Sequence, residues 1–80
     1  MYFVYIIKSI NYPDKFYTGD TTDIFQRLKE HNSGKSYHTA KYKPWELVCY
    51  TAFSDKNKAH QFERYLKTGS GVAFSNRHLR

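Results

Sequence analysis

The residues from Tyr2 to Ile7 form an unbroken run of aromatic and β-branched side chains near the amino terminus. A short run of this kind is typical of a β-strand covered on both faces, because a strand with a solvent face alternates polar and apolar residues. A chain with such a strand needs neighbouring strands and a packing layer on each side. This requirement constrains the fold more than any other feature.

A second strand is expected close to the first. Asn11-Tyr12-Pro13-Asp14 carries turn-forming residues, and Lys15 to Thr18 has the composition of a strand. We therefore expect a hairpin, with Gly19 ending the second strand.

A helix is expected next. Asp23 and the two threonines before it offer N-cap side chains, and Asn32-Ser33-Gly34 is a typical helix end. The helix would run to about His31, with Ile24 and Leu28 on its inner face. The basic, polar residues that follow, 35–44, predict a loop.

The rest of the chain predicts one strand and one long helix. Alternation over 45–53 predicts a strand with Trp45, Leu47, Cys49 and Phe53 on one side and Val48, Tyr50 and Ala52 on the other. Ser54 and Asp55 can cap a helix through Lys67, Gly69-Ser70-Gly71 is expected to break it, and 72–80 to add a short terminal helix. The β-β-α-β-α order predicts an α+β fold, a mainly antiparallel three-stranded sheet flanked by helices, in one domain spanning 1–80.

The charge balance favours a polyanionic partner. The chain has 13 basic and 7 acidic residues, a net charge of +6, and nucleic acid is the usual partner of such a surface. We find no apolar run that could span a bilayer and no signal peptide, so we expect a cytoplasmic protein without a membrane partner. The single cysteine, Cys49, excludes a disulfide framework, disfavours a cysteine-based zinc site and is expected in the core, as are Trp45 and the phenylalanines.

Two helices carry candidate site residues. Glu63 lies beside the apolar stripe of its helix, where a carboxylate needs a basic partner or a bound cation such as Mg²⁺ or Mn²⁺. Arg27 and His31, four residues apart, project from one side of the first helix. Arg27 either pairs with Asp23 on the surface or binds a phosphate, and His31 is either an ordinary surface or helix-end histidine or part of the same site.

Other candidates lie on the strands and in the basic stretch. Tyr5 and Tyr17 fall on adjacent strands of the predicted hairpin and are either ordinary sheet tyrosines or site residues. Basic residues interleaved with aromatic ones suit a nucleic-acid backbone, although a solvated loop is the simpler interpretation. The predicted nucleic-acid-binding residues are Lys35, Lys41, Lys43, Arg64 and Lys67.

Five short motifs in order resemble the GIY-YIG nuclease superfamily. They are Phe3-Val4-Tyr5, Tyr17-Thr18-Gly19, the segment 22–34 around Arg27, Pro44 to Val48, and Phe62 to Lys67. Each motif is weak alone, but together they span nearly the whole chain. The likeness is greatest to small stand-alone bacterial members similar to the amino-terminal domain of the nuclease component of excinuclease ABC. The run Glu30 to Gly34 is also similar to nucleases that resolve branched DNA.

The resemblance implies a metal-dependent endonuclease that hydrolyses phosphodiester bonds in DNA, with branched or damaged DNA in repair or recombination as the expected substrate. Its implied roles are Tyr5 as general base or as helper of a metal-bound hydroxide, Tyr17 as a phosphate or water contact, Arg27 as stabiliser of phosphate charge, His31 as orienting partner of Tyr5 or proton acceptor, and Glu63 as ligand of Mg²⁺ or Mn²⁺. A phenol needs nearby positive charge to lower its pKa for this work, and Arg27 with the metal is expected to supply it. Gly19 is expected to let the backbone turn beside the site.

Some residues depart from the family pattern. Phe3 replaces a glycine, and Asp20 follows Gly19, where its charge would either repel substrate or join the metal shell. We also expect no separate DNA-binding domain within the chain. A non-catalytic nucleic-acid-binding module, or a domain active only with a protein partner in a repair complex, therefore stays open, as does the oligomeric state.

Overall fold

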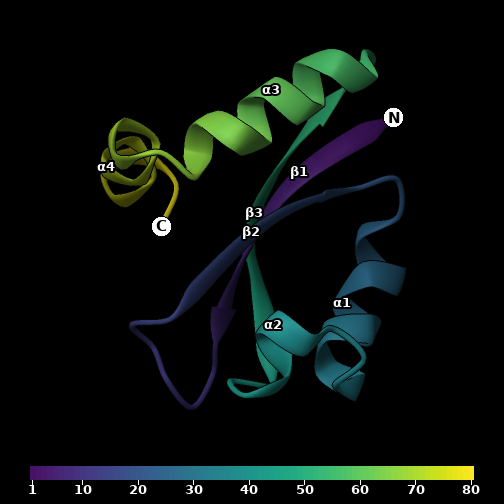
Figure 1. Ribbon diagram of the computed structural model, residues 1–80, viewed down its shortest axis with the longest axis vertical. Coiled ribbons are helices and arrows are strands. Elements are labelled where there is room, and N and C mark those ends of the chain that lie inside the picture. Colours follow the sequence, from purple (N-terminus) through teal and green to yellow (C-terminus); the bar gives the residue numbers. More distant parts are fainter.

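The computed structural model describes residues 1–80 and contains three strands and four helices (Figure 1). In chain order they are β1 (Tyr2–Ser9), β2 (Phe16–Thr21), α1 (Ile24–Ser33), α2 (Tyr37–Ala40), β3 (Trp45–Phe53), α3 (Lys56–Leu66) and α4 (Gly69–His78). The prediction of an α+β fold with a three-stranded sheet and flanking helices is confirmed. No helix is long and apolar enough to cross a membrane.

The apolar strand β1 lies at the centre of the sheet. The strand order is β2-β1-β3, and both pairings are antiparallel. Val4, Tyr5, Ile6 and Ile7 are each at most 2% exposed, as expected for a strand covered on both faces. The sheet lies between α3 on one side and α1 with α2 on the other (Figure 1).

Each face of the sheet has its own core. On the α3 face, Val4 and Ile6 pack with Ala59 and Leu66. On the α1 face, Tyr5 and Ile7 pack with Trp45, against the partly buried side chains of Tyr17, Leu28, Tyr42 and Leu47. Because successive residues of β1 point to opposite faces, one strand supplies both cores.

The predicted sides of β3 are wrong because a bulge interrupts its alternation. Ile6 pairs with Cys49 while its neighbour Ile7 pairs with Leu47, so Val48 is the extra residue. As a result, Trp45 and Leu47 pack on the α1 face while Cys49 and Phe53 pack on the α3 face.

The helix ends agree with the capping signals, and two other segments do not agree with prediction. Asp23 and Asp55 cap α1 and α3, and Gly34 ends α1 with φ of 82°. The expected loop 35–44 contains the short helix α2. Glycines 69 and 71 begin α4 under a Thr68 cap instead of only separating helices, because a capped first turn tolerates glycine.

Two expectations about exposure and backbone also change. Trp45 is buried at 4% exposure, but Phe25 is 78% exposed, so the phenylalanines are not all core residues. Gly19 lies inside β2 and has no positive φ, so it neither ends the strand nor makes a turn. Its structural role is found in the site described next.

Candidate active site

Tyr5 and His31 form a buried pair between β1 and α1. Tyr5 Oη lies 2.8 Å from His31 Nε2, and His31 is fully buried on the inner side of the helix. The interpretation of His31 as an ordinary surface histidine is therefore wrong. Burial, followed by the positive charge of Arg27, lowers the pKa of His31 below its usual value of 6.5. A neutral imidazole is thus favoured beside the Tyr5 hydroxyl.

Thr39, in α2, completes this pair and was missed from the sequence. Its Oγ1 lies 2.6 Å from His31 Nδ1, and the residue is fully buried. The Thr39 carbonyl also accepts a 2.8 Å hydrogen bond from Trp45 Nε1, which ties α2 to β3. No sequence signal marked Thr39, because α2 was expected to be loop.

Arg27 lies beside the Tyr5 hydroxyl and pairs with Glu30. The Arg27 Nη1 to Glu30 Oε1 distance is 2.8 Å, in a pair that is about one-third exposed. The expected pair with Asp23 is absent, because the Asp23 carboxylate caps α1 by accepting from the Gln26 amide. A hydrogen bond to Glu30, then one to Tyr5, raises the pKa of Arg27, so its charge is secure next to the phenol.

Arg27 acts to lower the pKa of Tyr5, as expected, but it does not outweigh burial, and the share assigned to a metal stays a prediction. Burial raises the pKa of the Tyr5 phenol to about 12, although a hydrogen bond and the charge of Arg27 oppose the rise. Desolvation penalises a phenolate more than one partly exposed guanidinium can offset. The phenol therefore stays protonated in the resting protein and needs an acceptor for its proton.

Gly19 makes room for Tyr5. The two residues are register partners on β2 and β1, and a Cβ at Gly19 would lie 2.5 Å from Tyr5 Oη and 3.2 Å from Tyr17 Cε2. Tyr17 is on the same face, with its ring centroid 5.2 Å from that of His31. The absence of a side chain at position 19 thus brings the two tyrosines together around the imidazole.

Glu63 is on the other face of the sheet from Tyr5 and is 8% exposed. Its carboxylate pairs with Lys67 at 2.6 Å, and the Lys67 ammonium also lies 5.5 Å from the centre of the Tyr17 ring. Because β2 is an edge strand, Lys67 links Glu63 to Tyr17 around that edge. The basic partner considered for Glu63 is therefore present, and no hydrogen bond joins Glu63 to Tyr5 or Arg27.

Asp20 has a partner of its own. Its Oδ2 lies 3.0 Å from Nδ1 of His60, on the α3 side of β2. No cluster of three or more histidine, cysteine or acidic side chains that could hold a metal is present. A metal at Glu63 would need water and substrate oxygens for its remaining ligands, which is the usual arrangement for Mg²⁺. One largely buried carboxylate beside an edge strand fits such an ion.

The predicted nucleic-acid-binding residues fall into two groups, and all of them are exposed. Lys35, Lys41 and Lys43 flank α2 near the end of α1, while Arg64 and Lys67 are at the end of α3. The groups lie on opposite sides of the sheet.

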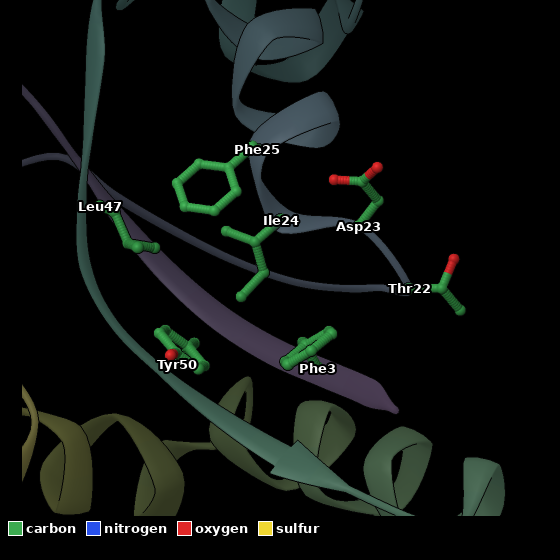
Figure 2. Close-up of a pocket in the computed structure, with 7 residues that line it drawn as sticks. All are labelled: Phe3, Thr22, Asp23, Ile24, Phe25, Leu47 and Tyr50. Atoms are coloured by element: carbon green, nitrogen blue, oxygen red, sulfur yellow. The ribbon is translucent and has the colours of Figure 1, made fainter.

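A pocket of about 220 Å³ lies away from these residues, between β3 and the start of α1 (Figure 2). It is lined by Phe3, Thr22, Asp23, Ile24, Phe25, Leu47 and Tyr50. None of the predicted site residues is among them. Figure 2 shows that the side chain of Ile24 extends from the start of α1 toward Tyr50 and Phe3 on the strands, with Phe25 next to it.

The fold and the site together define a class of protein. A phenol held between an imidazole and a guanidinium can move a proton beside a cation that binds phosphate, and a separate carboxylate can hold a metal. These are the parts of a phosphodiester-cleaving site. Residues 1–72 match the family model described as the GIY-YIG catalytic domain. The chain belongs to the GIY-YIG family.

Relatives of this chain fall into two groups. Structure-specific endonuclease subunit SLX1 of Debaryomyces hansenii is 40% identical over 73 residues, which is 82% of this chain and 21% of that protein. UPF0213 protein YazA of Bacillus subtilis is 37% identical, covering 82% of this chain and 66% of that protein. A UPF0213 protein of Staphylococcus haemolyticus is 37% identical over 86% of this chain and 83% of its own length.

The chain therefore matches small bacterial proteins over most of their length but spans only about a fifth of the fungal protein. The likeness to small bacterial family members is confirmed. The particular likeness to the nuclease component of excinuclease ABC stays a prediction.

Proposed function

We propose that this chain is an endonuclease that hydrolyses phosphodiester bonds in DNA with the help of Mg²⁺ or Mn²⁺. The observation that carries the proposal is the buried Tyr5 hydroxyl, hydrogen-bonded to His31 and flanked by Arg27. The match to a catalytic domain and the likeness to fungal endonuclease subunits support it. The fungal relatives are named structure-specific endonuclease subunits, which favours a substrate recognised by its structure, and we propose branched or damaged DNA as that substrate.

The chain's own residues would act on the phosphate and on the attacking water. Arg27 would bind a non-bridging phosphate oxygen and stabilise the charge that develops there. Tyr5 would accept the proton of the attacking water as it gives its own proton to His31, since a free phenolate is disfavoured in this buried site. Tyr17 would hydrogen-bond the phosphate or the water from the neighbouring strand.

Glu63 would hold the metal ion. Its carboxylate is near the edge of β2, and Lys67 is the charge that a metal would displace or share. A bound Mg²⁺ or Mn²⁺ would act as a Lewis acid on the phosphoryl oxygens. Asp20 is occupied by His60, so we do not include it among the metal ligands.

Cleavage by matched variants tests the proposal. The purified chain is incubated with supercoiled plasmid and with branched DNA, in Mg²⁺, in Mn²⁺ and in a chelator. We expect metal-dependent nicking that Glu63→Gln and Arg27→Ala each reduce about 100-fold or more, because each removes charge stabilisation in the transition state.

The control variants make the same two types of substitution at positions outside the site. Glu46→Gln and Arg77→Ala change exposed residues outside the site and should cleave like the parent. If Glu63→Gln and Arg27→Ala also cleave like the parent, the assigned roles are wrong. If the parent binds DNA in a salt-dependent way but cuts nothing with either metal, the chain is a nucleic-acid-binding module.

A protein partner is the second possibility that a specific observation favours. The fungal relatives are named as subunits of an endonuclease, and this chain has an exposed apolar pocket at Phe25. A domain active only with a partner would bind DNA alone but gain cleavage when that partner is added. Cleavage by the purified chain at full rate would exclude this alternative.

A further inference from the structure

Three buried side chains form a hydrogen-bonded series behind the Tyr5 hydroxyl. Tyr5 Oη lies 2.8 Å from His31 Nε2, and His31 Nδ1 lies 2.6 Å from Thr39 Oγ1. His31 and Thr39 are fully buried, and Tyr5 is 2% exposed. Because His31 and Thr39 are fully buried, the protons of this series need protein acceptors in the resting protein.

One end of the series fixes the direction of its protons. The Ser36 carbonyl lies 3.4 Å from Thr39 Oγ1, and a carbonyl can only accept. If Thr39 donates to that carbonyl, His31 Nδ1–H donates to Thr39, and Nε2 is free to accept from Tyr5. The order of donation that satisfies every proton is therefore Tyr5 to His31 to Thr39 to Ser36.

The reverse order leaves a proton without a partner. If Thr39 donated to Nδ1, the imidazole Nε2–H would donate to the Tyr5 oxygen. The Tyr5 O–H would then have no acceptor, because His31 is its one hydrogen-bonded acceptor. An unsatisfied hydroxyl in a site this buried is costly.

We propose that Thr39 is a positioning residue that fixes His31 as the Nδ1–H tautomer, so that Nε2 faces the Tyr5 hydroxyl as a proton acceptor. The tautomer follows from the geometry alone, and its effect on cleavage rests on the proposed function. Orientation of a histidine by a hydrogen bond to its second nitrogen is a general device, and the wrong tautomer cannot do the same chemistry.

The proton balance of the step is simple. As the water oxygen bonds to phosphorus, a water proton moves to Tyr5 Oη and the phenol's own proton moves to His31 Nε2. The bond from phosphorus to the leaving sugar oxygen breaks, and that oxygen takes a proton from solvent. The resulting imidazolium donates Nε2–H to Tyr5 and Nδ1–H to Thr39, so no ring rotation is needed.

The charged and titratable groups facing His31 come from three elements. They are Tyr5 of β1, Tyr17 of β2, and Arg27 and Glu30 of α1. Burial and then Arg27 lower the pKa of His31, while Glu30 raises it. The net lowering keeps the imidazole neutral near neutral pH, which an acceptor nitrogen requires.

Nitrogen NMR of the unmodified chain tests the tautomer directly. Protonated and unprotonated ring nitrogens of a neutral imidazole have widely separated ¹⁵N shifts, so ¹⁵N-histidine labelling assigns both atoms of His31. We expect a protonated Nδ1 and an unprotonated Nε2. A protonated Nε2 would overturn the proposal, and this measurement needs neither a variant nor cleavage.

Substitution of Thr39 tests its role. Thr39→Val removes the hydroxyl at similar volume and should shift His31 toward the Nε2–H tautomer and lower kcat about 10- to 100-fold with KM unchanged. Thr39→Ser keeps the hydroxyl and should restore both the tautomer and the rate. Thr51→Val, a control on β3, should leave both as in the parent.

The outcomes separate this proposal from the proposed function. If Thr39→Val cleaves like the parent or keeps the Nδ1–H tautomer, Thr39 does not position His31, whereas the nuclease assignment stands. If the parent does not cleave DNA, the tautomer measurement still decides the structural claim. Should Thr39→Val fail to fold, Thr39→Ser and the unmodified chain carry the test.

Discussion

Because His31 is buried, its protonation makes the free energy of unfolding of the protein depend on pH. The pKa of His31 is lowered in the folded state, chiefly by burial. As the pH falls below about 6.5, the unfolded chain therefore takes up a proton that the folded protein resists. The contribution of neutral His31 to the free energy of unfolding is fully present above that pH. It is lost as the pH falls toward the lower pKa of the folded state.

Urea denaturation of the parent and of His31→Asn checks this prediction at about pH 8 and about pH 5.5. We expect the free energy of unfolding of the parent to fall on acidification. The difference in free energy of unfolding between the parent and His31→Asn should therefore become smaller. His78→Gln, a change of an exposed histidine, should keep the parent's pH dependence. A gap that widens on acidification would contradict the lowered pKa.

Substitution of Gly19 should lower the cleavage activity while the protein remains folded. An alanine Cβ there would lie 2.5 Å from Tyr5 Oη, so the phenol must move away from its position beside His31. A shift of about 1 Å in a catalytic group costs about 100-fold in rate. We expect Gly19→Ala to lose cleavage to this extent, measured as kcat on plasmid DNA, and to remain folded by circular dichroism. Parent-like cleavage would show that Tyr5 does not need this space.

The residues of the site were predictable to different degrees. Tyr5, Arg27 and His31 were found by their spacing and motif, and the structure brings them together. Thr39 was not found, because its importance arises from a contact across eight residues inside a segment without periodicity. A buried hydrogen-bond partner leaves no pattern in the sequence when its own helix is a single turn long.

At the scale of the elements, the close packing of α4 on α3 depends on Gly71 far more than on Gly69. A Cβ at Gly71 would overlap the Tyr65 carbonyl and the Leu66 backbone, whereas a Cβ at Gly69 would meet nothing within 4 Å. We expect Gly71→Ala to cost about 2 kcal/mol or more, because the helices must separate. Gly69→Ala should be neutral or stabilise by about 0.5 kcal/mol.

Chemical denaturation of the two alanine variants compares them directly. They introduce the same methyl group two residues apart in the same first turn, so local helix propensity affects both in the same direction. Equal free energies of unfolding would mean that α4 does not pack on α3 as closely as the structure shows.

The positions of the strands and helices were predicted better than the faces that their side chains occupy. The run from Tyr2 to Ile7 predicted the central strand, and Asp23, Gly34 and Asp55 predicted helix ends, because these signals act locally. The bulge at Val48 was not predictable, since it depends on how β3 pairs with β1. Bulges reverse the alternation that a sequence pattern assumes, so the two cores of the sheet could not be assigned in advance.

At the scale of the whole molecule, the sheet separates the predicted DNA contacts into two groups. Lys41 follows α2 on the Tyr5 face, and Arg64 lies in the last turn of α3 on the Glu63 face. The proposed site uses residues from both faces, which approach each other around the edge strand β2. We therefore expect DNA that is cut there to contact both groups.

The salt dependence of DNA binding tests this arrangement without requiring cleavage. With a net charge of +6, the chain should lose affinity as salt rises, and each phosphate contact contributes about 0.9 to the slope of log affinity against log salt. We expect Lys41→Gln and Arg64→Gln each to lower the slope by about that amount, measured by fluorescence anisotropy in chelator. Lys29→Gln, an exposed charge outside the predicted set, should leave it unchanged. If only one of the two variants lowers the slope, DNA contacts one face of the sheet, and a site that spans the β2 edge is excluded.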